Sequence, residues 1–65
     1  MNTKLKEARL AARLTQEELS EKSGVPLTTI QKLESGEQDL LKTRIDTVLV
    51  LTKALGISIA ELVGD

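Results

Sequence analysis

A helix-start pattern, the capping box, occurs twice in this 65-residue sequence and restricts its fold more than any other feature. In the first copy the Thr15 hydroxyl can accept a hydrogen bond from the backbone N–H three residues on, while the Glu18 carboxylate reaches back to the cap. Ser58 and Glu61 repeat this spacing near the other end of the chain. Each copy predicts a helix that begins directly after its cap, at positions 16 and 59.

Glycines mark the ends of the predicted helices. Gly24, Gly36 and Gly56 each fall just past the end of a predicted helix, and a glycine there can take the positive φ that ends a helix. Pro26 suits the opening of a helix, because the N–H that proline lacks would be unpaired in the first turn. The sequence therefore predicts five helices, over about residues 4–13, 16–23, 26–35, 44–55 and 59–63. Residues 37–43 are expected to form a loop with room for one short turn.

The core must consist of aliphatic side chains, because the chain holds no aromatic residue. Apolar residues three and four positions apart lie on one face of a helix and predict which faces point inward. On the first and third helices these residues are Leu5, Ala8, Ala12, Ile30 and Leu33. On the fourth helix the expected core face comprises Ile45, Val48, Leu49, Thr52 and Leu55, widened by Leu51. The predicted fold class is all-α, a compact bundle of five helices.

Length and composition exclude most catalytic functions. A chain of 65 residues predicts a single domain over residues 1–65, too small for a catalytic site with a lid or a second lobe. Without cysteine or histidine it lacks thiolate nucleophiles, imidazole bases and the usual zinc ligands. We therefore expect no enzyme, no cofactor and no metal. The longest apolar run, residues 48–51, is too short for a signal peptide or a membrane span, so the expected location is the cytoplasm.

Charge is divided unevenly along the chain. Residues 1–32 hold six Lys or Arg against four Glu, a net charge of +2, whereas residues 33–65 hold three against six Asp or Glu, a net charge of -3. The total of -1 argues against a protein that coats nucleic acid without selectivity, since such proteins carry a strong basic excess. The N-terminal half is therefore the one expected to face phosphates.

The second and third predicted helices form a helix-turn-helix unit over residues 16–35. In such a unit two short helices are joined by a three- or four-residue turn with glycine, and the second helix can enter the major groove of DNA. Leu19, Ile30 and Leu33 are placed to hold the two helices at a fixed crossing angle. The side chains left to point outward, which are the candidate readers of bases, are Leu27, Thr28, Gln31 and Lys32.

This unit and the segments after it resemble the xenobiotic-response-element (XRE) family, the lambda-repressor-like group that includes phage repressors and Cro proteins. The matching strings are LTQEELSEKSGVPLTTIQKLESG, VLVLTKALGIS and AELV, so the resemblance covers nearly the whole chain. It implies a lambda-repressor-like fold with the helix-turn-helix at the second and third helices. It also implies a sequence-specific DNA-binding transcriptional regulator that acts as a repressor.

The resemblance assigns roles to the outward residues. Leu27, Thr28 and Lys32 match base-contacting positions of the family. Gln31 lies beside them. Lysine can donate to guanine, threonine can serve several bases, and leucine can pack on a thymine methyl group. The alternative for this group is an ordinary solvated helix face.

Other matching positions concern the DNA backbone. Gln16 matches a position that binds a phosphate and supports the recognition helix, although a plain polar residue of a first turn would look the same. After the third helix, Lys42, Thr43 and Arg44 are the expected phosphate contacts. The complete set of predicted DNA-binding residues is Gln16, Leu27, Thr28, Thr29, Gln31, Lys32, Lys42, Thr43 and Arg44.

Arg9 and Glu34 match a pair that bridges the first and third helices in phage repressors of this family. A half-buried carboxylate needs a cation, and a guanidinium supplies a fork that fits it. The sequence departs from the family at Pro26, where a Ser or Thr cap is common, which can shift the start of the third helix by one residue. It departs again at Ser20, where Ala is usual. The loop after the third helix is longer than the common form and begins with acidic residues.

Two kinds of partner are expected. One module buries too little surface for tight, selective binding, so we expect a homodimer on a double-stranded DNA operator. The candidate dimer surfaces, each of which could equally serve to close the core, comprise Ile59, Leu62 and Val63 of the fifth helix and Leu40 and Leu41 of the loop. The alternative function is an antitoxin-like protein-interaction module on the same fold, whose acidic second half would suit a basic toxin.

Overall fold

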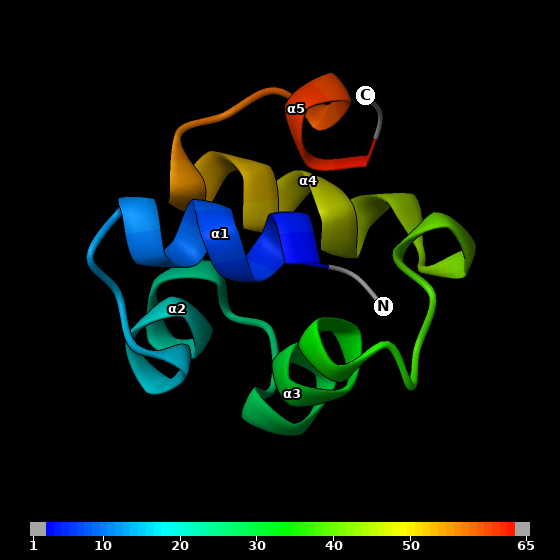
Figure 1. Cartoon of the computed structure of the whole chain (residues 1–65), viewed down its shortest axis with the longest axis horizontal. Coiled ribbons are helices and arrows are strands. Elements are labelled where there is room, and N and C mark those ends of the chain that lie inside the picture. The colour runs from blue at the N-terminus through cyan, green and yellow to red at the C-terminus, as the bar shows by residue number, and fades with distance from the viewer. Residues whose placement is uncertain (1–2, 64–65) are drawn as a thin grey trace.

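The computed structural model describes residues 3–63 of the chain, in which all regular elements are helical (Figure 1). In chain order they are α1 (Thr3–Ala11), α2 (Gln16–Ser23), α3 (Leu27–Ser35), the 3₁₀ turn η1 (Leu40–Lys42), α4 (Ile45–Leu55) and α5 (Ile59–Val63). The five predicted helices and the all-α class are confirmed, and η1 is the short turn in the loop at 37–43. Within residues 3–63 no helix is long and apolar enough to cross a membrane.

The first helix, α1, crosses the middle of the molecule in Figure 1. It contacts α3 on one side and α5 on the other. The second helix packs on α3 and α4, and α4 also contacts α5. The α2–α3 pair therefore lies on the side of α1 that is remote from α5.

Both predicted capping boxes are present. Thr15 Oγ1 accepts the backbone N–H of Glu18 at 3.0 Å, and the Glu18 carboxylate accepts the N–H of Thr15 at 2.8 Å. Ser58 and Glu61 form the same reciprocal pair, each bond 3.1 Å long. Because these bonds satisfy N–H groups that a helix start leaves unpaired, they fix where α2 and α5 begin.

The end of α1 differs from the prediction. The helix stops at Ala11, and Ala12, expected on the core face, is exposed. Arg13 adopts a φ of +61°, so that its N–H reaches Leu10 O at 3.0 Å and the N–H of Leu14 reaches Arg9 O at 3.1 Å. This bond pair is a Schellman ending, whose left-handed residue is most often glycine. Because arginine stands where glycine is usual, the sequence pattern does not indicate that α1 ends here.

The core consists of aliphatic side chains. Of the predicted core face of α4, Val48, Leu51, Thr52 and Leu55 are buried, whereas the prediction was wrong for Ile45 and Leu49. The buried apolar residues are Leu5, Leu19, Val25, Ile30, Leu33, Leu40, Val48, Leu51, Ala54, Leu55 and Leu62. Ile45 and Leu49 are 63% and 41% exposed, whereas Leu51 is fully buried near Val48 and Leu55. Two stripes with helical spacing overlap on this helix. Its packing against α2 and α5 selects the one that turns inward.

Arg13 offers a test of the strained end of α1. A left-handed residue other than glycine carries strain of about 1–2 kcal/mol, whereas a glycine there costs about 0.4–1 kcal/mol by enlarging the unfolded ensemble. We expect Arg13→Gly to raise the free energy of unfolding by about 0.5–1 kcal/mol, measured by urea denaturation. The control is Arg13→Ala, which keeps the strain. Equal gains in both variants would trace the effect to the side chain and contradict the prediction.

Candidate nucleic-acid interface

The turn between α2 and α3 is held by side-chain hydroxyls. Gly24 ends α2 with a φ of +80° and donates its N–H to Ser20 O at 2.9 Å. Ser20 Oγ donates to the carbonyl of Val25 at 2.6 Å, and Ser23 Oγ accepts the N–H of Val25 at 3.2 Å. Val25 itself is buried in the core. Ser20, which replaces the usual alanine, thus ties the turn to α2.

Pro26 occupies the position before α3. Its φ of -56° and ψ of 142° are extended, and its carbonyl accepts the N–H groups of Thr29 at 3.0 Å and Ile30 at 3.2 Å. The helix therefore begins at Leu27, one residue after the predicted start. Since no side chain caps this end, its start depends on the fixed φ of proline.

One face of α3 is open to solvent. Thr28, Gln31, Lys32 and Ser35 are exposed and stand three and four residues apart, so they share one side of the helix. We call these four residues the reading face. The structure thus brings together three of the predicted base readers. Leu27 is half-buried next to this face.

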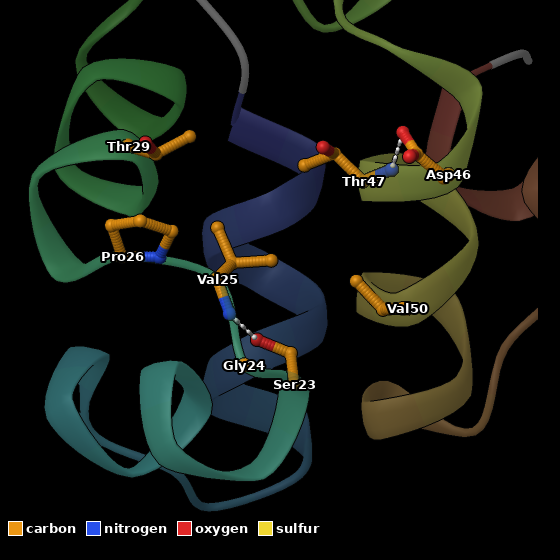
Figure 2. A pocket seen from close by; sticks show the side chains of 8 residues that line it. All are labelled: Ser23, Gly24, Val25, Pro26, Thr29, Asp46, Thr47 and Val50. Atoms are coloured by element: carbon orange, nitrogen blue, oxygen red, sulfur yellow. Dashed lines mark hydrogen bonds between the residues drawn. The ribbon is translucent and has the colours of Figure 1, made fainter.

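Thr29 points elsewhere. It is half-buried and lines a shallow, open groove between the helix-turn-helix and α4, which Figure 2 shows in close-up. Val25 and Pro26 stand beside Thr29, while Asp46, Thr47 and Val50 come from α4 across the groove. The structure therefore separates Thr29 from the reading face, although its predicted role stays a prediction.

The predicted pair of Arg9 and Glu34 is confirmed, and it belongs to a larger network. Arg9 Nε donates to Glu34 Oε2 at 2.7 Å and Nη2 donates to Oε1 at 3.2 Å, with both residues buried. Arg9 Nη1 also donates to the carbonyl of Leu14 at 2.8 Å. Gln16 Nε2 donates to Glu34 Oε1 at 3.0 Å. Since Glu34 lies on the side of α3 away from the reading face, the network anchors the helix to α1 and α2.

Lys32 has an acidic neighbour that sequence reasoning missed. Its Nζ lies 4.0 Å from Glu37 Oε2, and both side chains are more than half exposed. Gly36, in a left-handed conformation with a φ of +87°, ends α3 and folds the chain back. A separation of five residues across a helix end has no periodic signal, so the sequence could not reveal this contact.

The remaining predicted residues lie around η1. Lys42 is exposed at its end, and the side chain of Arg44 is 84% exposed, with Nη2 3.1 Å from Asp46 Oδ2. Thr43 Oγ1 is engaged inside the loop, where it donates to the carbonyl of Asp39 at 2.9 Å. The two cations are thus open to solvent, whereas the hydroxyl also stabilises the loop.

Comparison with known proteins decides the family. A family model described as helix-turn-helix, HTH_3, matches residues 5–62. The chain belongs to this family. The XRE-type, lambda-repressor-like resemblance and the fold that it implied are thereby confirmed, and this HTH_3 chain is a DNA-binding helix-turn-helix regulator. No curated protein and no solved structure matches the chain.

Glu34→Ala tests the anchor of α3. The variant leaves the Arg9 guanidinium buried without its carboxylate, and breaking a buried pair in this way costs about 3–5 kcal/mol. We expect the free energy of unfolding, measured by urea denaturation, to fall by that amount. The matched control, Glu37→Ala at an exposed carboxylate, should change it by less than about 0.5 kcal/mol.

A second variant covers the case in which Glu34→Ala does not fold. The double variant Arg9→Met with Glu34→Leu replaces both charges of the pair by apolar side chains. Such replacements often leave the free energy of unfolding unchanged or raise it. The double variant should therefore fold more stably than Glu34→Ala. Native stability in Glu34→Ala itself would contradict the role of the pair.

Proposed function

We propose that this protein is a sequence-specific transcriptional repressor that binds a double-stranded DNA operator as a homodimer, with α3 in the major groove. The reading face carries the proposal. Thr28, Gln31 and Lys32 are exposed along it. On the opposite side of the helix, Leu33 and Glu34 are buried. A helix that is anchored at its back and carries hydrogen-bonding groups at its front has the layout of a recognition helix.

The chemistry of the reading face suits base edges. Lys32 can donate to the O6 and N7 of guanine, and Gln31 can form a bidentate pair with the N6 and N7 of adenine. Thr28 can hydrogen-bond several bases, and Leu27, at the margin of the face, can contact a thymine methyl group. Thr29 would act from the groove side, next to these readers.

The groups proposed for the DNA backbone surround this helix. An amide side chain has two N–H donors, so Gln16 can hold Glu34 with one and meet a phosphate with the other. Lys42 and Arg44 offer exposed cations from the loop and the start of α4. Thr43 between them would contribute a hydroxyl. Such contacts position the protein on the duplex and carry no sequence information directly.

Repression follows from occupancy. A small domain that covers the major groove at its operator excludes other proteins from the same stretch of DNA. Selection from a random duplex library tests the proposal, because a regulator that reads bases should enrich one motif. Binding to all duplexes alike, or to none, would argue against it and favour the protein-interaction module.

Alanine variants should separate base reading from backbone contact. Thr28→Ala and Lys32→Ala should each cost about 1–3 kcal/mol on the selected duplex and relax the preference at particular base pairs. Arg44→Ala should weaken selected and scrambled duplexes alike. Its slope of log affinity against log salt should fall by about 0.9 per site, doubled in a dimer.

The control is Lys53→Ala, a change at another exposed lysine, in the last turn of α4, which should leave both affinities unchanged. Fluorescence polarisation over a series of salt concentrations measures all four variants. A Lys32 variant that weakens both duplexes equally, together with an Arg44 variant that alters sequence preference, would reverse the two assignments.

The proposed homodimer predicts the architecture of the operator. Two α3 helices related by a two-fold axis require two half-sites about 10–10.5 base pairs apart, or a multiple of that distance. The selected motif should therefore be a pseudo-palindrome that binds two chains at saturation. Sedimentation of the complex gives the stoichiometry, and one chain per saturated operator would refute the dimer.

A further inference from the structure

Large apolar side chains remain exposed along one edge of the molecule. Leu41 in η1 is 72% exposed, and Ile45 and Leu49, one turn apart on α4, are 63% and 41% exposed. We call these three residues the lateral surface. A small soluble domain that leaves several aliphatic side chains in water at one edge has a surface of the kind that a partner covers. Val50, also exposed, belongs instead to the groove of Figure 2.

The other residues predicted for a dimer surface mostly serve the core. Leu40 and Leu62 are 3% and 1% exposed. Ile59 packs against the core, and the side chain of Val63 lies outside the described part of the chain. Among the described members of that predicted set, Leu41 is the one left exposed.

The location of α3 restricts where a second copy can dock. In a two-fold complex both α3 helices must face the same side of one duplex. Because α1 lies between α3 and α5, contact through α5 would direct the two α3 helices away from each other (Figure 1). The lateral surface belongs to η1 and to the first half of α4. The segment that follows α3 lies at the right edge of the molecule in Figure 1. Contact through the lateral surface leaves the two α3 helices on the same side of the dimer, where one duplex can meet both.

We propose that a second copy of this chain docks on the lateral surface, with the two-fold axis near Ile45. An axis at this residue brings Leu41 of each copy toward Leu49 of the other. It also brings Arg44 toward Asp46 of the other copy, because these two residues directly precede and follow Ile45 in the chain. A two-fold interface requires such self-complementarity. The inference rests on the proposed function, which demands that two α3 helices share one duplex.

We call Arg44 and Asp46 the charged rim. Their pairing within one chain can be replaced by pairing between two copies with little loss of folding free energy. Within one chain Arg44 Nη2 lies 3.1 Å from Asp46 Oδ2, with side chains that are 84% and 64% exposed. Such an exposed pair contributes little to folding. In the dimer each carboxylate meets the guanidinium of the other copy. A guanidinium has five N–H donors, so Arg44 can still reach a phosphate while it holds a carboxylate.

Sedimentation equilibrium of the free protein tests the apolar part of the surface. The native chain should form dimers, and Ile45→Glu should raise their dissociation constant by about 30-fold by placing charges at the axis. Leu10→Glu, at an apolar residue of α1 that is 55% exposed, is the matched control and should leave the constant unchanged. Circular dichroism verifies that both variants fold. A native chain that is monomeric up to its solubility limit would overturn the proposal and leave the lateral surface to a different protein.

Mixing two charge variants tests the orientation of the second copy. Arg44→Asp makes both rim positions negative, and Asp46→Arg makes both positive. Each variant alone should be monomeric, because like charges then face each other across the axis. An equal mixture should form heterodimers, since each acidic position then meets a basic one. Dimers of either variant alone that are as tight as native dimers, or no dimers in the mixture, would overturn the proposal.

These experiments use no DNA, so their results do not depend on whether the proposed function is correct. If the chain dimerises through the lateral surface but enriches no duplex, the interface is supported and the proposed operator binding is contradicted. If the chain enriches a motif and the Ile45→Glu variant dimerises as well as the native chain, operator binding is supported and this interface is contradicted.

Discussion

The buried contact of Arg9 with Glu34 determines the orientation of α3, on which the rest of the structure depends. Aliphatic contacts through Ile30 and Leu33 hold α3 on the core, but hydrophobic burial is not directional. Hydrogen bonds to both oxygens of one carboxylate are directional, and they come from α1 through Arg9 and from α2 through Gln16. Rotation of α3 about its axis would break them. The reading face therefore points outward because Glu34 is held inward.

Local hydrogen bonds stabilise helix starts and the turn between α2 and α3, because the small aliphatic core offers no directional contacts of its own. The capping boxes at Thr15 and Ser58 define two helix starts without help from tertiary contacts. The hydroxyls of Ser20 and Ser23 hold the turn that sets the distance between α2 and α3. A domain of this size cannot bury every apolar residue. The exposed residues Leu41, Ile45 and Leu49 are what its own core leaves uncovered.

Most of the candidate site followed from the sequence, since the outward residues of α3 are the complement of its apolar stripe. Once Ile30 and Leu33 point inward, helical spacing places Thr28 and Lys32 outward. The direction of Thr29, toward α4, depends on how two helices meet across the groove. The contact of Glu37 with Lys32 depends on how the chain turns after α3. Neither has a signature in residue spacing.

The sequence by itself determined the number and class of the helices and most of their ends, because caps, glycine stops and proline act within a few residues of the chain. Only the tertiary structure decided which stripe of α4 is buried. Ile45 and Leu49 are as apolar as Val48 and Leu51, and the packing of α4 against α2 and α5 separates the two pairs. Arg13 shows the same limit, because it adopts a positive φ that the sequence pattern would assign to a glycine. The Arg9 side chain, which is held by Glu34 of α3, also bonds the carbonyl of Leu14 directly after it.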